Sequence, residues 1–221
     1  AILEQTVDSN HIIFTVLKKG AIYSLVAVSM NLLNGFTGLF SLGQAGFMLI
    51  GAYTYAIFTM PVEVKMTEQV YKYYASAIHF DTGIFVGLIC AGLAAALFAA
   101  LIGLPVLRLK SDYLAIATIG FAEIIRAIFQ WDVLGPITNG ANVMREYLDL
   151  TDVKIPFTDI PFPPTLYVFL AAGVCIALIV LLINSSYGRA FKAIRDDEVA
   201  AEAMGINLFK HKEMSFVISS F

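Results

Sequence analysis

The sequence is poor in charge and in the residues that build catalytic or metal sites. Only 14% of its 221 residues are charged, and it holds 2 cysteines and 3 histidines. Cys90 and Cys175 each stand alone inside an apolar run, where cysteine acts as a small hydrophobic residue, and they lack metal-ligand spacing. His11, His79 and His211 are isolated as well. We therefore expect no metal site and no cofactor.

Motifs for nucleotide chemistry and nucleophilic catalysis are also missing. The sequence contains no Walker A pattern and no serine-nucleophile elbow. Its formal net charge of -3 does not supply the basic patch that nucleic-acid binding requires. We therefore expect a protein that is not an enzyme, has no ATPase site of its own and does not bind nucleic acid.

Apolar residues, in contrast, are abundant. They make up 59% of the chain, and the mean hydropathy of +0.79 is typical of membrane proteins. A hydrocarbon core of about 30 Å is crossed by about 20 apolar residues of helix. The segments that meet or approach this length are 38–60, 83–107, 113–130 and 165–184. The predicted fold class is all-α, a polytopic transmembrane helical bundle forming a single domain over residues 1–221.

The two ends of the sequence led to one further expectation. The chain begins without Met and ends within a new apolar run, EMSFVISSF. We expect a chain that is truncated at its C-terminus and continues into further spans.

Basic residues predict how the chain is oriented. Residues 187–212 are polar and lie between two apolar segments, and their basic residues are Arg189, Lys192, Arg195, Lys210 and Lys212. The positive-inside rule places such a segment in the cytoplasm. Arg108 and Lys110, which precede the span 113–130, then lie on the same side. The acidic, proline-rich residues 131–164 become an extracytoplasmic loop.

A short cytoplasmic helix is predicted within residues 187–212. Residues 190–204 are mostly good helix formers. Gly205, followed by Asn207, is a suitable helix stop because glycine adopts the left-handed conformation without penalty. We expect one helix that ends near Met204, and then a turn.

The first sixty residues allow two interpretations. Residues 12–33 can form a span that enters from outside, but Lys18 and Lys19 would then lie in its outer half. Alternatively, these lysines mark the cytoplasmic interface, the first crossing starts near Gly20, and part of residues 34–51 is re-entrant or broken. Non-helical backbone at membrane depth is tolerated only where it is buried in protein or lines a watery cavity. A broken segment here would belong to a transport pathway.

Small and polar residues alternate through NLLNGFTGLFSLGQAGFMLIGAY, residues 31–53. Small residues let helices approach closely in lipid, so a tight helix seam and a pathway role are both open, and they are compatible. Asn34, Thr37, Ser41 and Gln44 recur at spacings of three and four, which places them near one face if the segment is helical. That face must meet protein or water, so these four are candidate substrate-path residues.

An acid and a base interrupt the apolar span 113–130. Glu123 and Arg126 are three positions apart and are neighbours on one helix face. Ionisable groups inside spans are costly and usually face the protein interior. We expect a mutually neutralising structural pair or, alternatively, a role in the substrate path or its gating. Ser111 or Asp112 is expected to cap the start of this helix.

Three segments, in this order, resemble one known family. They are similar to the branched-chain amino acid permeases of bacterial ABC importers, the LivM/LivH type. The segments are residues 31–53, SDYLAIATIGFAEIIR (111–126) and GRAFKAIRDDEVAAEAMGIN (188–207). The third segment resembles the coupling loop of ABC permeases. The usual Glu-Ala-Ala, three residues, Gly pattern reads Val199, Ala200, Ala201 and Gly205 here, with glutamates displaced to Glu198 and Glu202. ITNGAN, at residues 137–142, departs from the family's Thr-Gly-Gly-Pro-Asn-Gly stretch.

The resemblance implies a multi-pass permease subunit of the bacterial inner membrane that translocates branched-chain amino acids. It implies a second permease subunit, cytoplasmic ABC ATPase subunits and an extracytoplasmic substrate-binding protein as partners. The expected ATPase-coupling residues are Asp196, Asp197, Glu198, Ala200, Ala201, Glu202 and Gly205. A urea or short-chain amide permease of the same superfamily shares these motifs, and a passive channel or secondary transporter is the alternative from a different class. The exact substrate, and whether the permease dimer is homomeric, stay open.

Overall fold

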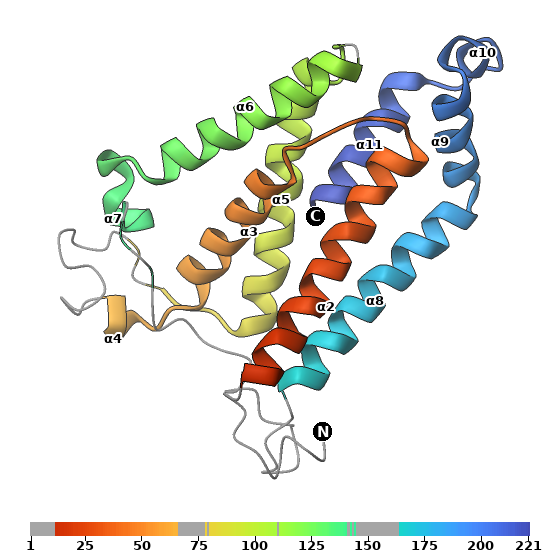
Figure 1. Ribbon diagram of the computed structural model, residues 1–221. Helices are drawn as coiled ribbons and strands as arrows, with labels where there is room; N and C mark the ends of the chain where they lie inside the picture. The colour runs from red at the N-terminus through yellow and green to blue at the C-terminus, as the bar shows by residue number, and fades with distance from the viewer. Residues whose placement is uncertain are drawn as a thin grey trace. The chain divides into compact units, whose positions relative to one another are not determined.

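In the computed structural model, the described residues are 12–65, 78, 80–109, 111–140, 142, 144 and 164–221, and they form helices with short connections (Figure 1). The predicted all-α fold class is confirmed for this part of the chain. Contacts divide the chain into two compact units, the first made of residues 1–38 and 149–211 and the second of residues 39–148 and 212–221. The single domain over residues 1–221 stays a prediction.

The first unit contains the helix pair α2 and α8. Its elements are α2 (Ile12–Asn31), the π-helix η1 (Leu32–Phe36), α8 (Pro164–Asn184), α9 (Ser186–Asp196) and α10 (Glu198–Ala203). α2 and α8 run side by side (Figure 1). Ala21 packs against Val168 and Ala172, with Leu25 at the edge of this buried cluster. Small side chains at the contact allow the two helices to approach closely.

The first helix begins earlier than the second interpretation of the first sixty residues assumed. Ile12–Phe36 is a continuous apolar helix that is long enough to cross a membrane. Gly20 therefore lies inside the helix and does not begin it. The same interpretation also required a break within residues 34–51, and residues 37–43 are not helical. Gly38 has a φ of 74°, a left-handed conformation that glycine adopts without steric penalty.

The second unit is built on α3, α5 and α6. Its elements are α3 (Gln44–Thr59), α4 (Val62–Lys65), α5 (Ile84–Val106), α6 (Ser111–Phe129), the 3₁₀-helix η2 (Asp132–Leu134) and α7 (Gly135–Thr138). The later residues of α11 (Leu208–Ser220) also belong to this unit. The predicted span 38–60 is wrong in its extent, since only the 16 residues of α3 are helical. The chain before α3 is held in an irregular path by Thr118 of α6, whose Oγ1 accepts a hydrogen bond from Leu42 N.

Glycines of α3 meet α6 at close range. A Cβ added at Gly43 would lie 2.9 Å from the main-chain oxygen of Thr118, and one at Gly46 would lie 3.0 Å from Ala122 Cα. A larger side chain at either position would force the helices apart. The seam interpretation of residues 31–53 is therefore confirmed at these two glycines.

The last residues of the chain pack on α3 as well. Phe216 is fully buried, and its ring meets the ring of Phe47 edge-on with the centroids 5.4 Å apart. Gln44 Nε2 donates a hydrogen bond to the main-chain oxygen of Ser219. These contacts connect the start of α3 to the end of α11.

In the part of the chain that the structure describes, three helices are long and apolar enough to cross a membrane: Ile12–Phe36, Ile84–Val106 and Thr165–Asn184. The second and third confirm the predicted helices over 83–107 and 165–184. A fourth crossing is possible if Tyr113–Phe129 and Asp132–Thr138, which meet at a 57° bend, form one broken span. These helices support a multi-pass membrane protein.

Candidate functional site

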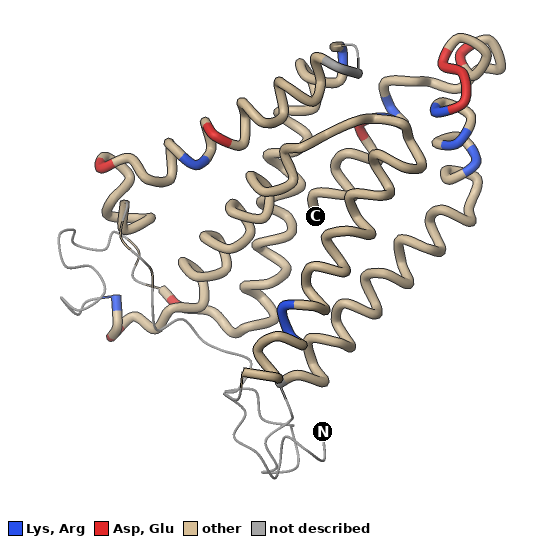
Figure 2. The backbone as a smooth tube through the Cα atoms, viewed as in Figure 1, with Lys and Arg blue, Asp and Glu red and all other residues tan. Residues whose placement is uncertain are grey.

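Most of the charged residues that the structure describes in the first unit lie on α9 and α10, whereas α8 carries none along its length (Figure 2). α9 begins directly after α8 because Ser185 caps it, with Oγ accepting a hydrogen bond from Tyr187 N. Phe191 and Ile194 are fully buried, and they anchor one face of α9. The opposite face leaves the basic side chains exposed or half-buried.

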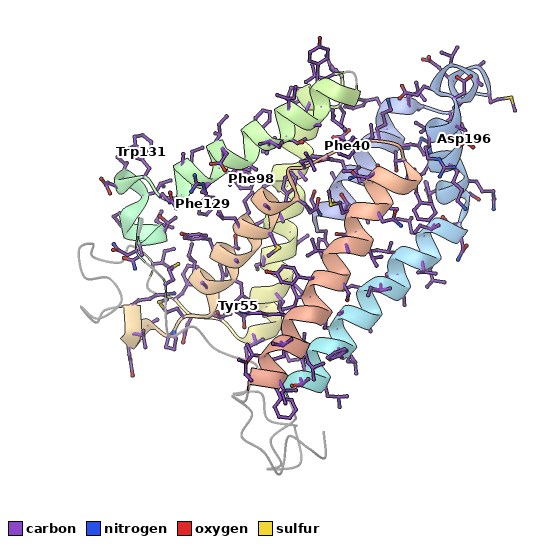
Figure 3. All side chains as sticks on the ribbon, viewed as in Figure 1. Phe40, Tyr55, Phe98, Phe129, Trp131 and Asp196 are labelled. Atoms are coloured by element: carbon purple, nitrogen blue, oxygen red, sulfur yellow. The ribbon has the colours of Figure 1, made fainter. Side chains whose placement is uncertain are left out.

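The single helix predicted over residues 190–204 is wrong, because the chain breaks at Asp197. This residue is extended, with φ −159° and ψ 111°, and separates α9 from α10. Its Oδ1 accepts hydrogen bonds from Val199 N at 2.8 Å and from Ala200 N at 3.1 Å. Aspartate is favoured at such an N-cap position, where its carboxylate accepts hydrogen bonds from the free N–H groups of the first turn. In a helix interior it is unfavourable. Figure 3 labels Asp196, the residue just before this break, where α9 ends.

The predicted end of the helix is confirmed. Gly205 has a φ of 85°. Its N–H donates to Glu202 O at 2.9 Å, and the N–H of Ile206 donates to Ala201 O at 3.1 Å. Together these two hydrogen bonds form a Schellman motif, which ends a helix at a left-handed residue.

α10 exposes a face that differs from the one expected. Ala201 is buried and faces the interior of its unit, so it is not available to a partner. Val199 and Met204 are instead 77% and 83% exposed, beside exposed Ala200 and Ala203. The other expected coupling residues, Asp196, Asp197, Glu198, Glu202 and Gly205, are exposed. Val199 and Met204 were not among the expected coupling residues, because no pattern in the sequence shows which side of this short helix is exposed.

α9 also contacts the π-helix at the end of α2. Arg195 Nη1 donates a hydrogen bond to the main-chain oxygen of Gly35 at 3.0 Å. Lys192 Nζ lies 5.5 Å from the centre of the Phe36 ring, a cation–π distance. Residues 192–195 and 35–36 are far apart in the sequence, and no motif identified their contact.

The four polar candidates for a substrate path do not share a helix face. Asn34 lies in η1, Thr37 and Ser41 lie outside any helix, and Gln44 is the first residue of α3. Thr37 and Ser41 are buried, and Thr37 Oγ1 donates to Leu32 O. The common face was inferred from helical periodicity, which ends where the backbone leaves the helix at Thr37.

Glu123 and Arg126 form the predicted ion pair on α6. Glu123 Oε2 accepts from Arg126 Nε at 2.9 Å and lies 2.8 Å from Nη2. The side chains are 62% and 56% exposed, respectively, so the pair does not face the interior of its unit. Within this chain, therefore, neighbouring helices do not cover the pair. In Figure 3, Phe129 and Trp131 mark where α6 ends and the chain bends.

Several predictions fall outside the described residues. These include Lys110, His11 and His79, the side chains of Ser111 and Asp112, and most of the loop 131–164. α6 does begin at Ser111. Among the residues that the structure describes, no group of three or more His, Cys, Asp or Glu could hold a metal ion.

Comparison with known proteins connects these features. A family model described as "Branched-chain amino acid transport system / permease component" matches residues 12–221. The permease protein LivM of the high-affinity branched-chain amino acid transport system of Escherichia coli K12 is 31% identical over 221 aligned positions. The corresponding protein of Salmonella typhimurium LT2 gives the same identity. Each alignment covers 90% of this chain and 47% of the relative, so the chain spans about half the length of these relatives.

No solved structure matches the chain significantly. The family model nevertheless covers nearly all of it, and the apolar helices agree with a membrane transport component. The chain belongs to the family of permease components of branched-chain amino acid transport systems.

Proposed function

We propose that the chain is part of a membrane-spanning permease subunit of an ABC importer that translocates branched-chain amino acids across the bacterial inner membrane. The family match and the names of the LivM relatives support the substrate class. The subunit has no ATPase site of its own and works with a second permease subunit, cytoplasmic ATPase subunits and an extracytoplasmic binding protein. Residues 187–212 are its cytoplasmic coupling loop, and residues 131–164 its extracytoplasmic loop.

The observation that carries the proposal is the exposed face of α10. Val199, Ala203 and Met204 present apolar surface, and Glu198 and Glu202 present acidic side chains beside it. An exposed apolar strip with a charged flank suits helix-in-groove docking, with the charges selecting the partner. Asp197 and Gly205 fix both ends of α10, so a partner meets a short, defined helix. We propose that the ATPase subunit binds this helix.

The substrate path is the less specified half of the proposal. Asn34, Thr37, Ser41 and Gln44 lie in or next to the break between η1 and α3, where irregular backbone belongs to a buried or water-lined region. Glu123 and Arg126 are further candidates, because an exposed ion pair on a membrane helix must meet protein or water.

The test is uptake by the complete complex in proteoliposomes. We expect accumulation of labelled leucine that requires ATP and the binding protein, and no comparable uptake of urea. ATP-independent uptake would indicate a channel or secondary transporter, and ATP-dependent urea uptake would indicate the amide branch. Within the same assay, a Val199→Ser/Met204→Ser variant should lose ATPase association while still inserting into the membrane. Tyr187→Ser, at a half-exposed apolar residue of α9, is the control and should keep it.

A further inference from the structure

The π-helix η1 is an unusual way to end a membrane helix, and α9 holds it in place. We propose that Arg195 is a positioning residue for transport, whose guanidinium holds η1 so that a displacement of α9 and α10 is passed to η1 and to Thr37 and Gly38, the non-helical residues that follow it. The proposal rests on the proposed function, because it assigns to one residue the connection between the coupling loop and the broken segment.

η1 depends on close local contacts. π-helical turns are rare and occur frequently at functional sites. A Cβ at Gly35 would collide with Asn31 Oδ1, so the Asn31 side chain would have to turn away to admit a larger residue. Thr37 Oγ1 donates to Leu32 O, five residues back, and closes the end of the turn. The turn therefore has a specific shape that depends on its neighbours.

Arg195 connects this turn to the start of α10. Nη1 donates to Gly35 O, while Nε and Nη2 donate to Asp196 Oδ1 at 3.1 Å and 2.9 Å. The planar guanidinium is thus fixed between a carboxylate and a main-chain carbonyl, which a lysine ammonium cannot reproduce. Asp196 directly precedes Asp197, the cap of α10. A single side chain therefore joins η1 to Asp196, the last residue of α9, next to the cap of α10.

The backbone after η1 also lies against Arg195. A Cβ at Gly38 would be 2.9 Å from Arg195 Cγ and 3.3 Å from its Cα, so the chain passes directly over this residue. Lys192, three positions earlier on α9, lies over the Phe36 ring. Because Phe191 and Ile194 anchor α9 by complete burial, the helix can carry these contacts as one body.

Two features indicate that Arg195 transmits motion between α9 and η1 rather than only stabilising the fold. Arg195 is 45% exposed, and partly solvated polar contacts contribute little to stability. The elements it contacts, a π-turn and a left-handed glycine, lie where a helix ends, and hinges are formed by a few such loop or element-terminal residues. Removal of Arg195 should thus affect the coupling of ATP hydrolysis to transport more than it affects folding.

The test is Arg195→Gln in the complete complex, with leucine uptake and ATP hydrolysis measured together in proteoliposomes. We expect normal assembly, an unchanged unfolding temperature, and a fall of about tenfold in leucine transported per ATP hydrolysed, within the range of typical coupling energies. Arg189→Gln is the matched control, because Arg189 is an exposed arginine of the same helix that donates to Ser186 Oγ. This control should keep the wild-type ratio.

A second variant reaches the same contact from the opposite side. Gly38→Ala places a side chain at positive φ and against Arg195, so it should lower the ratio similarly. The double variant should be no worse than either single one, since both disturb one contact. An unchanged ratio in Arg195→Gln, or loss of assembly, would overturn the proposal. A wild-type complex without ATP-dependent uptake would instead contradict the proposed function.

Discussion

Thr118 Oγ1 accepts a hydrogen bond from Leu42 N at 3.1 Å and donates one to Ala115 O at 2.9 Å. One buried hydroxyl thereby connects α6 to the irregular chain before α3. The amide of Leu42 obtains from this side chain the partner that a continuous helix would have supplied. The contact explains how a non-helical segment is accommodated within the second unit.

Replacing this hydroxyl should lower stability. Thr118→Val keeps the shape of the side chain but removes the acceptor of the Leu42 amide, and loss of such a hydrogen bond costs about 1 kcal/mol. The measurement is the unfolding temperature in detergent. Thr59→Val is the matched control, because Thr59 is equally buried and its Oγ1 donates to Tyr55 O within its own helix. Equal losses in the two variants would contradict a special role for the Leu42 contact.

The cap of α10 gives a local prediction. Asp197→Ala removes the acceptor for Val199 N and Ala200 N, and loss of such a cap costs about 1 kcal/mol. We expect faster amide hydrogen exchange in α10, with little change in α8. Asp197→Asn keeps a side-chain oxygen and should stay close to the wild type. Unchanged exchange in Asp197→Ala would show that the cap does not hold the helix.

The sequence predicted the elements that depend on a local apolar pattern or on a residue that ends a helix. α5 and α8 follow from uninterrupted apolar length, and the end of α10 follows from Gly205. Glu123 and Arg126 were paired correctly because their spacing alone brings them together. Their exposure was not predicted, since which face a membrane helix buries depends on its neighbours rather than on its own pattern.

The misses occurred where distant contacts decide the backbone. Asp197 was assigned to a helix interior because propensity favours one helix, yet its capping bonds outweigh that small preference. The break at residues 37–43 is held by Thr118 on one side, and the turn before it by Arg195. Both partners are more than seventy positions away in the sequence, so no local pattern reveals them.

Lys65, at the end of α4, gives a prediction on pH. Its side chain is buried, and Nζ donates to Phe80 O at 2.6 Å. Burial lowers the pKa of Lys65, and the nearby charge of Asp81 opposes part of this effect. The unfolded chain, with an ordinary lysine pKa, then binds more protons than the folded chain between the two pKa values. Stability should therefore rise with pH across that alkaline interval.

The check is the unfolding temperature of the wild type and of Lys65→Met as a function of pH. Lys65→Met carries no titrating group at this position, so its slope in the alkaline interval should be smaller than that of the wild type. Lys210→Met, at an exposed lysine, is the control and should keep the wild-type slope. Identical slopes for all three proteins would show that Lys65 titrates normally.

The Glu123–Arg126 pair gives the last prediction. The two side chains neutralise each other on a largely apolar helix, at N–O distances of 2.8 Å and 2.9 Å. Removing one partner leaves an uncompensated charge, which is more costly in an apolar setting than removal of both. Glu123→Gln and Arg126→Gln should each reduce the amount of folded protein in the membrane and its leucine uptake. The double variant should recover part of both.

The surroundings of the pair decide how large this recovery is. If the exposed face of α6 meets lipid or an apolar partner, the double variant should approach the wild type. Two uncharged side chains then replace an ion pair that has no net charge. If the face lines a watery path, single variants should insert normally and lose uptake alone, because water solvates the remaining charge. Glu123→Gln that folds and transports normally would show that the pair serves neither purpose. Measuring membrane level and uptake in the same cells separates these outcomes.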